Sequence, residues 1–243
     1  MSRAVAAVDK YISGILDFTK QLPTLSDIWS GDSVYEYSGF LSDDHVSDIL
    51  DRVMSDWTRA YPFVEEKHTG EPYYCIRCLG QNFWSLPPHP DYDDHFDPEL
   101  RSYMLQEYRD INEYLENFCR DYLNKTPEYV PGIATPGFNI VTSDLVGTYW
   151  HTDGALIRKI PDIDVKKIIS VNIPIQCDKQ SHTEFRLGES AWPYKARLVP
   201  GSMLIWPGRK IHRFGCQTIQ DDHYRITYQA HIYDAGDRAL IYF

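Results

Sequence analysis

Over roughly the first 130 residues, apolar positions recur mainly at the spacing of a helix. In residues 4–18 and again from Ser42 onward, apolar side chains lie three and four positions apart, which places them on one helix face. Ser42 is also a good N-cap residue. The clearest helix is predicted from Pro98 to about residue 123, with Asp97 placed to cap its first turn. Two shorter runs in this part are typical of strands, at 73–79 and 82–86.

The pattern changes after Pro131, where no long helical period remains. Short runs rich in β-branched and aromatic residues follow, separated by turn residues such as Pro200-Gly201-Ser202. The predicted strands are 138–141, 145–151, 168–175, 183–187, 194–199, 203–206, 211–216 and 224–233. Such a series of short strands favours a sandwich or jelly roll. We therefore predict a mainly β fold with bracing α-helices, as a single domain 1–243 with a helical bracing part (1–130) and a β core (131–243).

Composition and charge narrow the classes of partner. The net charge is −11, and no run of lysine and arginine exceeds two residues, so a nucleic-acid partner is not expected. No apolar run approaches the ~18 residues that a membrane span needs, and the N-terminal segment lacks the apolar core of a signal peptide. Cys75 and Cys78 form a CxxC pair without a second pair at zinc-ligand spacing, so we interpret both as buried free thiols. We expect a cytoplasmic protein that binds neither nucleic acid nor membrane, and the sequence leaves its oligomeric state open.

Three histidine–aspartate pairs raise the question of metal binding. They are His89-Pro-Asp91, His95-Phe-Asp97 and His151-Thr-Asp153. Two side chains at this spacing point the same way only on extended backbone, because strand side chains alternate. The first pair lies in a loop rich in proline and aspartate, and the aspartate of the second already caps a predicted helix. The third pair ends a predicted strand, so it is the strongest candidate for a metal site.

His212 is the best candidate for a further metal ligand. A site of two histidines and one carboxylate needs a second histidine that the fold brings near the first pair. His212 follows an apolar strand and a Pro-Gly turn, far enough from Asp153 for several strands to intervene. His182 also precedes an arginine, but it lies in a polar segment close to Asp153 in the sequence. His223 and His231 could line a pocket or be structural.

Arg225 stands out on the last predicted strand. It shares one face of that strand with Thr227, while apolar residues occupy the other face. An arginine inside a packed strand needs a partner, and a dicarboxylate supplies one through paired hydrogen bonds.

Together, His151-Thr-Asp153, His212 and Arg225-x-Thr227 resemble the HxD…H…RxS/T signature of the Fe(II)/2-oxoglutarate-dependent dioxygenases. The resemblance covers roughly residues 135–233 and implies a double-stranded β-helix, the cupin-like form of the jelly roll. It implies that His151, Asp153 and His212 form the catalytic iron centre. It also implies that Arg225 and Thr227 bind the distal carboxylate of 2-oxoglutarate, which O2 oxidises to succinate and CO2. Halogenating members of the family lack the carboxylate ligand, so Asp153 favours hydroxylation, desaturation or cyclisation.

Further residues are expected to line the pocket. Tyr149 and Asn139 are predicted to contact the cosubstrate, because they lie on strands beside the metal pair. Asn172 and Trp206 are candidates for contacts with the substrate. Arg158 follows the metal pair and could bind an acidic substrate group, with a solvated surface arginine as the alternative.

Three functional classes follow from these features. The first is an oxygenase acting on a small molecule, such as an amino acid or an intermediate of specialised metabolism. The second is a peptide- or protein-modifying hydroxylase of the same family. The third is a cupin-like binding protein without catalysis. The full set of candidate ligands together with Arg225 favours an enzyme over the third class.

Overall fold

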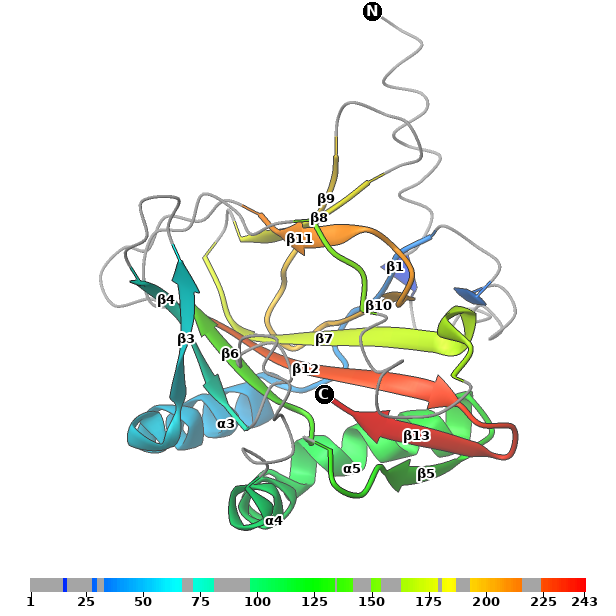
Figure 1. Ribbon diagram of the computed structural model, residues 1–243, viewed down its shortest axis with the longest axis horizontal. Helices are drawn as coiled ribbons and strands as arrows, with labels where there is room; N and C mark the ends of the chain where they lie inside the picture. The colour runs from blue at the N-terminus through cyan, green and yellow to red at the C-terminus, as the bar shows by residue number, and fades with distance from the viewer. Residues whose placement is uncertain are drawn as a thin grey trace, which may run out of the picture.

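The computed structural model describes residues 15–16, 28–29, 33–66, 72–80, 97–133, 135–141, 150–153, 163–178, 181–186, 193–215 and 224–243. Within these ranges the chain forms a large β-sheet, a small β-sheet and a group of helices. The helices lie along one face of the large sheet, and the small sheet lies over its opposite face (Figure 1). In the described part of the chain, no helix is both long and apolar enough to cross a membrane.

The large sheet is centred on two long antiparallel strands. In spatial order its strands are β1 (Ile15–Leu16), β2 (Tyr35–Tyr37), β10 (Met203–Pro207), β7 (Ile168–Gln176), β12 (Arg225–Asp234), β6 (Gly137–Val141), β4 (Pro72–Leu79) and β3 (Tyr61–Glu66). β12 pairs with β7 along most of its length, and its other edge pairs first with β6 and then with β13 (Arg238–Tyr242). β13 in turn pairs in parallel with β5 (Thr126–Tyr129).

The small sheet contains β11 (His212–Phe214), β8 (His182–Phe185) and β9 (Tyr194–Arg197), in that spatial order. His151 forms an isolated antiparallel bridge with His212, so the segment that carries the first histidine–aspartate pair extends this sheet beyond β11. Phe185 of the small sheet contacts Trp206 of the large sheet, with ring centroids 5.3 Å apart. The two sheets therefore face one another across a shared interior, as expected for a jelly roll.

The helices brace the large sheet as predicted. They are α3 (Asp43–Ser55), η1 (Trp57–Arg59), α4 (Pro98–Glu107), α5 (Arg109–Asn117), the π-helical segment η3 (Phe118–Tyr122) and the short η5 (Val165–Lys167). Ser42 caps α3 by accepting a hydrogen bond from the His45 main chain, and Asp97 caps α4 through Glu99 and Leu100. Both predicted caps are therefore confirmed.

The single long helix predicted from residue 98 to 123 is interrupted at Tyr108. Its ψ of 34° departs from helical geometry, and α4 ends there. Two side-chain donors lie at the break. The Arg52 guanidinium donates to the carbonyl of Glu107, and the Asn112 amide donates to that of Met104 (3.2 Å), which also accepts its helical bond from the Tyr108 amide (3.3 Å). The Arg52 side chain thus satisfies a carbonyl group at the junction, which a continuous helix would have satisfied itself.

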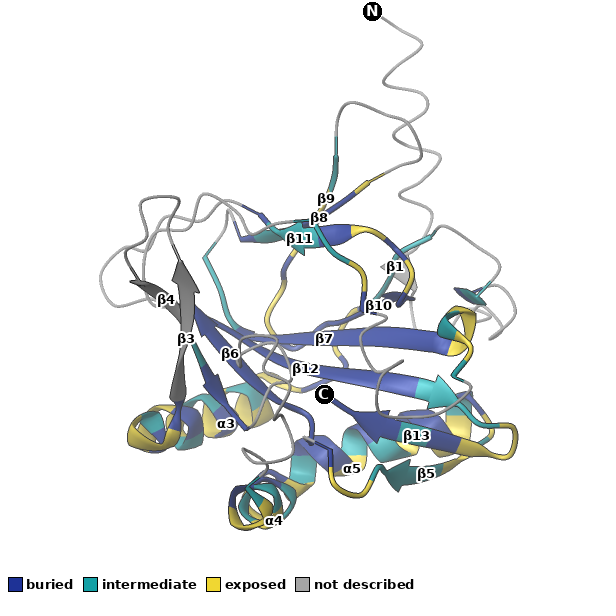
Figure 2. Ribbon diagram, viewed as in Figure 1, coloured by how far each residue is buried: buried dark blue, intermediate teal, exposed yellow. Residues whose placement is uncertain are grey.

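The central strands β7 and β12 have one apolar and one mainly polar face, and residues on both faces are buried (Figure 2). Alternate residues of β7 and β12 join the main apolar core with the helices: Ile169, Val171, Ile173, Ile175, Ile226, Tyr228, Ala230 and Ile232. The opposite side, called the inner face below, carries Asn139, Ser170, Asn172, Arg225, Thr227, Gln229 and His231. Burial of each large apolar side chain is worth ~1.5–3 kcal/mol, and a shift of one residue in register would invert every side chain. The apolar core thus fixes the polar residues in the interior between the sheets.

The fold class follows the prediction, with some differences in detail. Every strand predicted after residue 131 within the described ranges is present, while β2, β3, β5 and β13 were not predicted. The helix predicted at 4–18 is wrong at Ile15–Leu16, because these residues pair in parallel with β2 at the sheet edge. The rest of that helix, the strand predicted at 82–86 and most of the strand at 145–151 lie outside the described residues.

Candidate metal centre

The first histidine–aspartate segment is held against β11 by its main chain. His151 and His212 exchange two backbone hydrogen bonds, of 3.0 and 2.9 Å. The Asp153 amide donates to the carbonyl of Gly208 (2.8 Å), in the turn between β10 and β11. These bonds bring together residues that are widely separated in the sequence.

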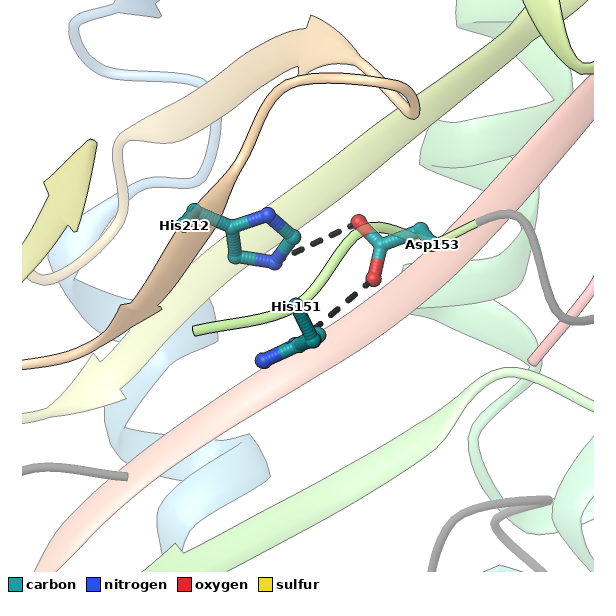
Figure 3. A group of neighbouring side chains, drawn as sticks. All are labelled: His151, Asp153 and His212. Carbon is teal, nitrogen blue, oxygen red and sulfur yellow. Dashed lines mark ion pairs between the residues drawn. The ribbon is translucent and has the colours of Figure 1, made fainter. Parts of the chain in front are cut away.

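The side chains of His151, Asp153 and His212 converge on one point (Figure 3). Nε2 of His212 lies 3.4 Å from Oδ2 of Asp153, and Nε2 of His151 lies 3.9 Å from Oδ1. One ligand atom from each residue falls within 4.8 Å of the others. Asp153 and His212 are buried, whereas His151 is partly exposed. Two imidazoles and a carboxylate at this spacing form the facial donor set that non-haem iron prefers.

His212 is oriented as a metal ligand. Its Nδ1 lies 2.8 Å from the carbonyl of Lys210, which only accepts, so Nδ1 carries the proton. Nε2 therefore has a free lone pair, and this buried atom has no hydrogen-bond partner. Burial is the main influence that lowers the pKa of His212, which keeps the imidazole neutral as metal binding requires.

Asp153 is a buried carboxylate that stays ionised. Burial alone would raise its pKa and is the largest single influence. The neighbouring His212, His231 and His151, with a hydrogen bond from Ser170, outweigh it and hold the pKa of Asp153 below its usual value. The serine hydroxyl donates to Oδ2 at 2.5 Å. The site thus presents a negative ligand in surroundings that otherwise exclude charge.

Arg225 is a buried cation on the inner face. One guanidinium nitrogen donates to the carbonyl of His182 (3.1 Å) and another approaches Oγ1 of Thr183 (3.4 Å). Its Nε has no partner, and no carboxylate among the described residues forms an ion pair with it. Burial lowers the pKa of Arg225 to about 10, so the side chain is still charged at neutral pH. The nearby Asp178 carboxylate acts against this lowering of the pKa but forms no ion pair with Arg225. A buried positive charge without an ion-pair partner among the described residues can bind an anionic group.

Solved structures share this architecture, although no protein-family model and no curated protein matches the chain in sequence. A 2OG-Fe(II) oxygenase family oxidoreductase from Burkholderia pseudomallei superposes with a TM-score of 0.52 at 14% identity, covering 94% of this chain and 99% of that chain. The fold is that of the 2OG-Fe(II) oxygenases. AviO1 from Streptomyces viridochromogenes Tue57 gives a TM-score of 0.48 at 13% identity, over 90% of this chain and 98% of that one. A Pseudomonas putida prolyl-4-hydroxylase gives 0.46 at 14% identity, over 88% and 98%.

Four other predicted pocket residues lie on strands of this oxygenase fold. Thr227 and Asn172 are on the inner face, and a side-chain oxygen of each is buried without a hydrogen-bond partner. The Asn139 amide donates to Gln229 and accepts from the Cys78 thiol (3.2 Å), so its described contacts are structural. Trp206 packs against the His212 ring, with centroids 5.1 Å apart.

Among the alternative metal candidates that the structure describes, Asp97 and His182, neither belongs to this centre. Asp97 caps α4, while His89, Asp91 and His95 lie outside the described residues. His182 lies on β8, with Nε2 3.2 Å from Oε1 of Glu184. The predicted pocket residues Tyr149 and Arg158 also lie outside the described residues, as does His223. Cys78 is buried and is not part of a disulfide, as predicted.

Sequence reasoning missed the partners that orient the ligands in this oxygenase fold. The Gly208 and Lys210 carbonyls are main-chain groups, which no side-chain pattern reveals. The sequence does carry a signal for Ser170, which is a small polar residue within a strand of buried apolar neighbours. The strand pattern predicts that His231 could line a pocket, and His231 does face the interior, but its link to Asp153 through Ser170 depends on the fold.

Proposed function

We propose that the protein is an Fe(II)- and 2-oxoglutarate-dependent dioxygenase that oxidises a small molecule. The observation that carries this proposal is the presence, in one interior, of a three-residue donor set and a buried arginine that forms no ion pair with a described carboxylate and whose Nε has no hydrogen-bond partner. A metal site alone would also suit a hydrolase or a structural ion. The arginine adds a requirement for a negatively charged ligand beside the metal, which a dicarboxylate cosubstrate meets.

In this proposal each residue has a defined task. His151, Asp153 and His212 hold Fe(II) and leave three coordination positions open. Arg225 binds the distal carboxylate of 2-oxoglutarate, and Thr227 supplies a hydrogen bond from its unpartnered hydroxyl. When bound, iron and 2-oxoglutarate supply the oxidising chemistry, in which O2 yields succinate, CO2 and a substrate oxidised by two electrons.

The substrate class rests on charge and on the site's surroundings. A net charge of −11 disfavours nucleic-acid substrates. The inner face offers amide and hydroxyl groups, among them an Asn172 oxygen without a partner, which suit a small polar molecule such as an amino acid or a specialised metabolite. We favour hydroxylation, desaturation or cyclisation, because Asp153 occupies the ligand position that halogenating members of the family leave to a halide.

The proposal is tested by measuring succinate formed from 2-oxoglutarate with Fe(II) and O2. Panels of amino acids, small metabolites and peptides are compared with a reaction that lacks substrate. We expect one small-molecule class to stimulate succinate release in the wild-type protein, and Asp153→Ala to abolish it. Stimulation by peptides alone would transfer the proposal to a peptide-modifying hydroxylase. No turnover with any panel, together with no binding of Fe(II), would contradict the enzymatic function.

A further inference from the structure

A buried serine on β7 connects the metal centre to a histidine on β12. Ser170 has no exposed surface and lies opposite His231 in the register of the two strands. Its hydroxyl lies 2.5 Å from Oδ2 of Asp153 and 3.3 Å from Nδ1 of His231. The three side chains therefore form a continuous polar chain that begins at the carboxylate ligand.

The donors and acceptors in this chain can be assigned by counting protons. An ionised carboxylate only accepts hydrogen bonds, so the single hydroxyl proton of Ser170 is donated to Asp153. The Ser170 oxygen is then left to accept, and the atom facing it is Nδ1 of His231. Nδ1 must therefore carry the proton of the imidazole. This directionality means that His231 orients the serine, and the serine orients the carboxylate.

The His231 ring is itself fixed in place. It is buried, and its face packs against Tyr242 with ring centroids 5.3 Å apart. The Phe243 ring meets it edge-on at 6.2 Å. Tyr242 is the last residue of β13 and lies opposite His231 in the register with β12, and Phe243 follows it in the chain. The imidazole therefore cannot rotate freely away from Ser170.

We propose that Ser170 and His231 are positioning residues that set the rotation of the Asp153 carboxylate for metal binding. This inference rests on the proposed function, because it assigns the metal site to the same three ligands. The hydrogen bond engages Oδ2, so it restrains rotation of the carboxylate about its Cβ–Cγ bond and disfavours chelation by both oxygens. Outer partners of this kind fix ligand geometry in metal sites and contribute to affinity.

The test measures the affinity of the metal-free protein for Co(II) by titration calorimetry, without cosubstrate or turnover. Ser170→Ala removes the donor, and we expect the Kd to rise about 10- to 100-fold. His231→Phe keeps the aromatic packing but removes the Nδ1 proton, and we expect a smaller rise of about 3- to 10-fold. In the double variant, the effects should be less than additive in free energy, because both substitutions act through one hydrogen-bonded chain.

Ser202→Ala is the matched control. Ser202 is also a buried serine with one hydrogen bond, to the carbonyl of Val199 (2.8 Å), and it precedes β10 at the end away from Gly208. We expect this variant to bind Co(II) as the wild type does, even if its melting temperature falls as much as that of Ser170→Ala. Such a result separates ligand positioning from a general loss of stability.

The outcomes distinguish this inference from the proposed function. If the wild type binds Co(II), His212→Ala does not, and Ser170→Ala binds as tightly as the wild type, the positioning role is wrong while the metal site stands. If the effects of Ser170→Ala and His231→Phe on the free energy of Co(II) binding are strictly additive, the two residues do not act through one hydrogen-bonded chain, and the inference is also wrong. If the wild type fails to bind Co(II), both the inference and the proposed metal centre are wrong.

Discussion

The main chains of His151 and His212 are joined by two hydrogen bonds, of 3.0 and 2.9 Å, although the residues lie on distant segments of the sequence. The imidazoles are consequently neighbours, with ring centroids 4.4 Å apart. Two ligands are thus positioned by backbone pairing within the small sheet, while the inner face of the large sheet supports the third through Ser170. The centre therefore lies where the two sheets meet, and its geometry follows from the fold before a metal binds.

Replacing Arg225 should weaken the binding of 2-oxoglutarate without lowering the stability of the protein. Arg225→Met retains length and apolar packing but removes a buried charge that forms no ion pair with a described carboxylate and whose Nε has no hydrogen-bond partner. We expect the free energy of unfolding of the ligand-free protein to stay the same or to rise by up to about 4 kcal/mol. The Kd for 2-oxoglutarate should rise about 10- to 100-fold in calorimetric titrations of the Co(II)-loaded protein, because hydrogen bonds to a charged group are lost.

Arg225→Lys is the matched variant for this test. It keeps the charge but loses the planar fork of donors, so its affinity for 2-oxoglutarate should lie between those of the wild type and Arg225→Met. A strongly destabilised Arg225→Met protein that binds 2-oxoglutarate normally would mean that the arginine is structural.

Asp97 should contribute to stability and not to metal binding. Its carboxylate accepts hydrogen bonds of 2.9 Å from the Glu99 and Leu100 amides at the start of α4. We expect Asp97→Ala to lower the free energy of unfolding in denaturant by ~0.5–2 kcal/mol, the usual value of an N-cap. Its Kd for Co(II) should equal that of the wild type, whereas Asp153→Ala should not bind. Weakened Co(II) binding by Asp97→Ala would show that the wrong histidine–aspartate pair has been chosen.

Glu184 should make stability depend on pH. Burial acts to raise its pKa and is the largest influence, but hydrogen bonds from Arg213 and His182 outweigh it and hold the pKa below its ordinary 4.5. A carboxyl with a lowered folded-state pKa stabilises the protein above its unfolded-state pKa, and this contribution is lost as the pH falls further. We expect Glu184→Gln to lower the free energy of unfolding at pH 7 by about 1–3 kcal/mol.

The difference between Glu184→Gln and the wild type should persist down to about pH 5 and shrink below pH 4.5 in urea unfolding curves. Glu113→Gln is the control, because Glu113 pairs with Arg109 on the exposed surface. Its effect should stay within about 0.5 kcal/mol at every pH. If the free energies of unfolding of Glu184→Gln and the wild type differ by a constant amount from pH 7 to pH 3, Glu184 does not stabilise the fold through its charge.

The sequence predicts which three side chains converge at the candidate metal centre, because their chemistry is carried by residue type and strand position. Alternation on β12 placed Arg225 and Thr227 on one face, and the structure confirms that face as the inner one. The role of Ser170 as the hydrogen-bond partner of Asp153 could not be predicted in the same way. Serine is common on buried strands, and its partner Asp153 comes from a segment that pairs with β11.

Helix boundaries also depend on long-range contacts that the local sequence does not reveal. The apolar stripe of residues 98–123 is continuous, and its members pack on the core as predicted. The break at Tyr108 comes from Arg52, a residue of α3 whose guanidinium reaches the Glu107 carbonyl and Asp110. Local periodicity contains no information about a donor that arrives from another helix. β13 was missed because it is a short strand after a turn, and its pairing with β12 defines it.

The central claim is tested most directly by anaerobic visible spectroscopy of the protein with Fe(II) and 2-oxoglutarate. We predict a weak metal-to-ligand charge-transfer band that requires both additions, because the cosubstrate must chelate iron held by the facial donor set. The band should be absent in His212→Ala and should need far more 2-oxoglutarate in Arg225→Met. Absence of the band in the wild-type protein, or its persistence in His212→Ala, would contradict the account.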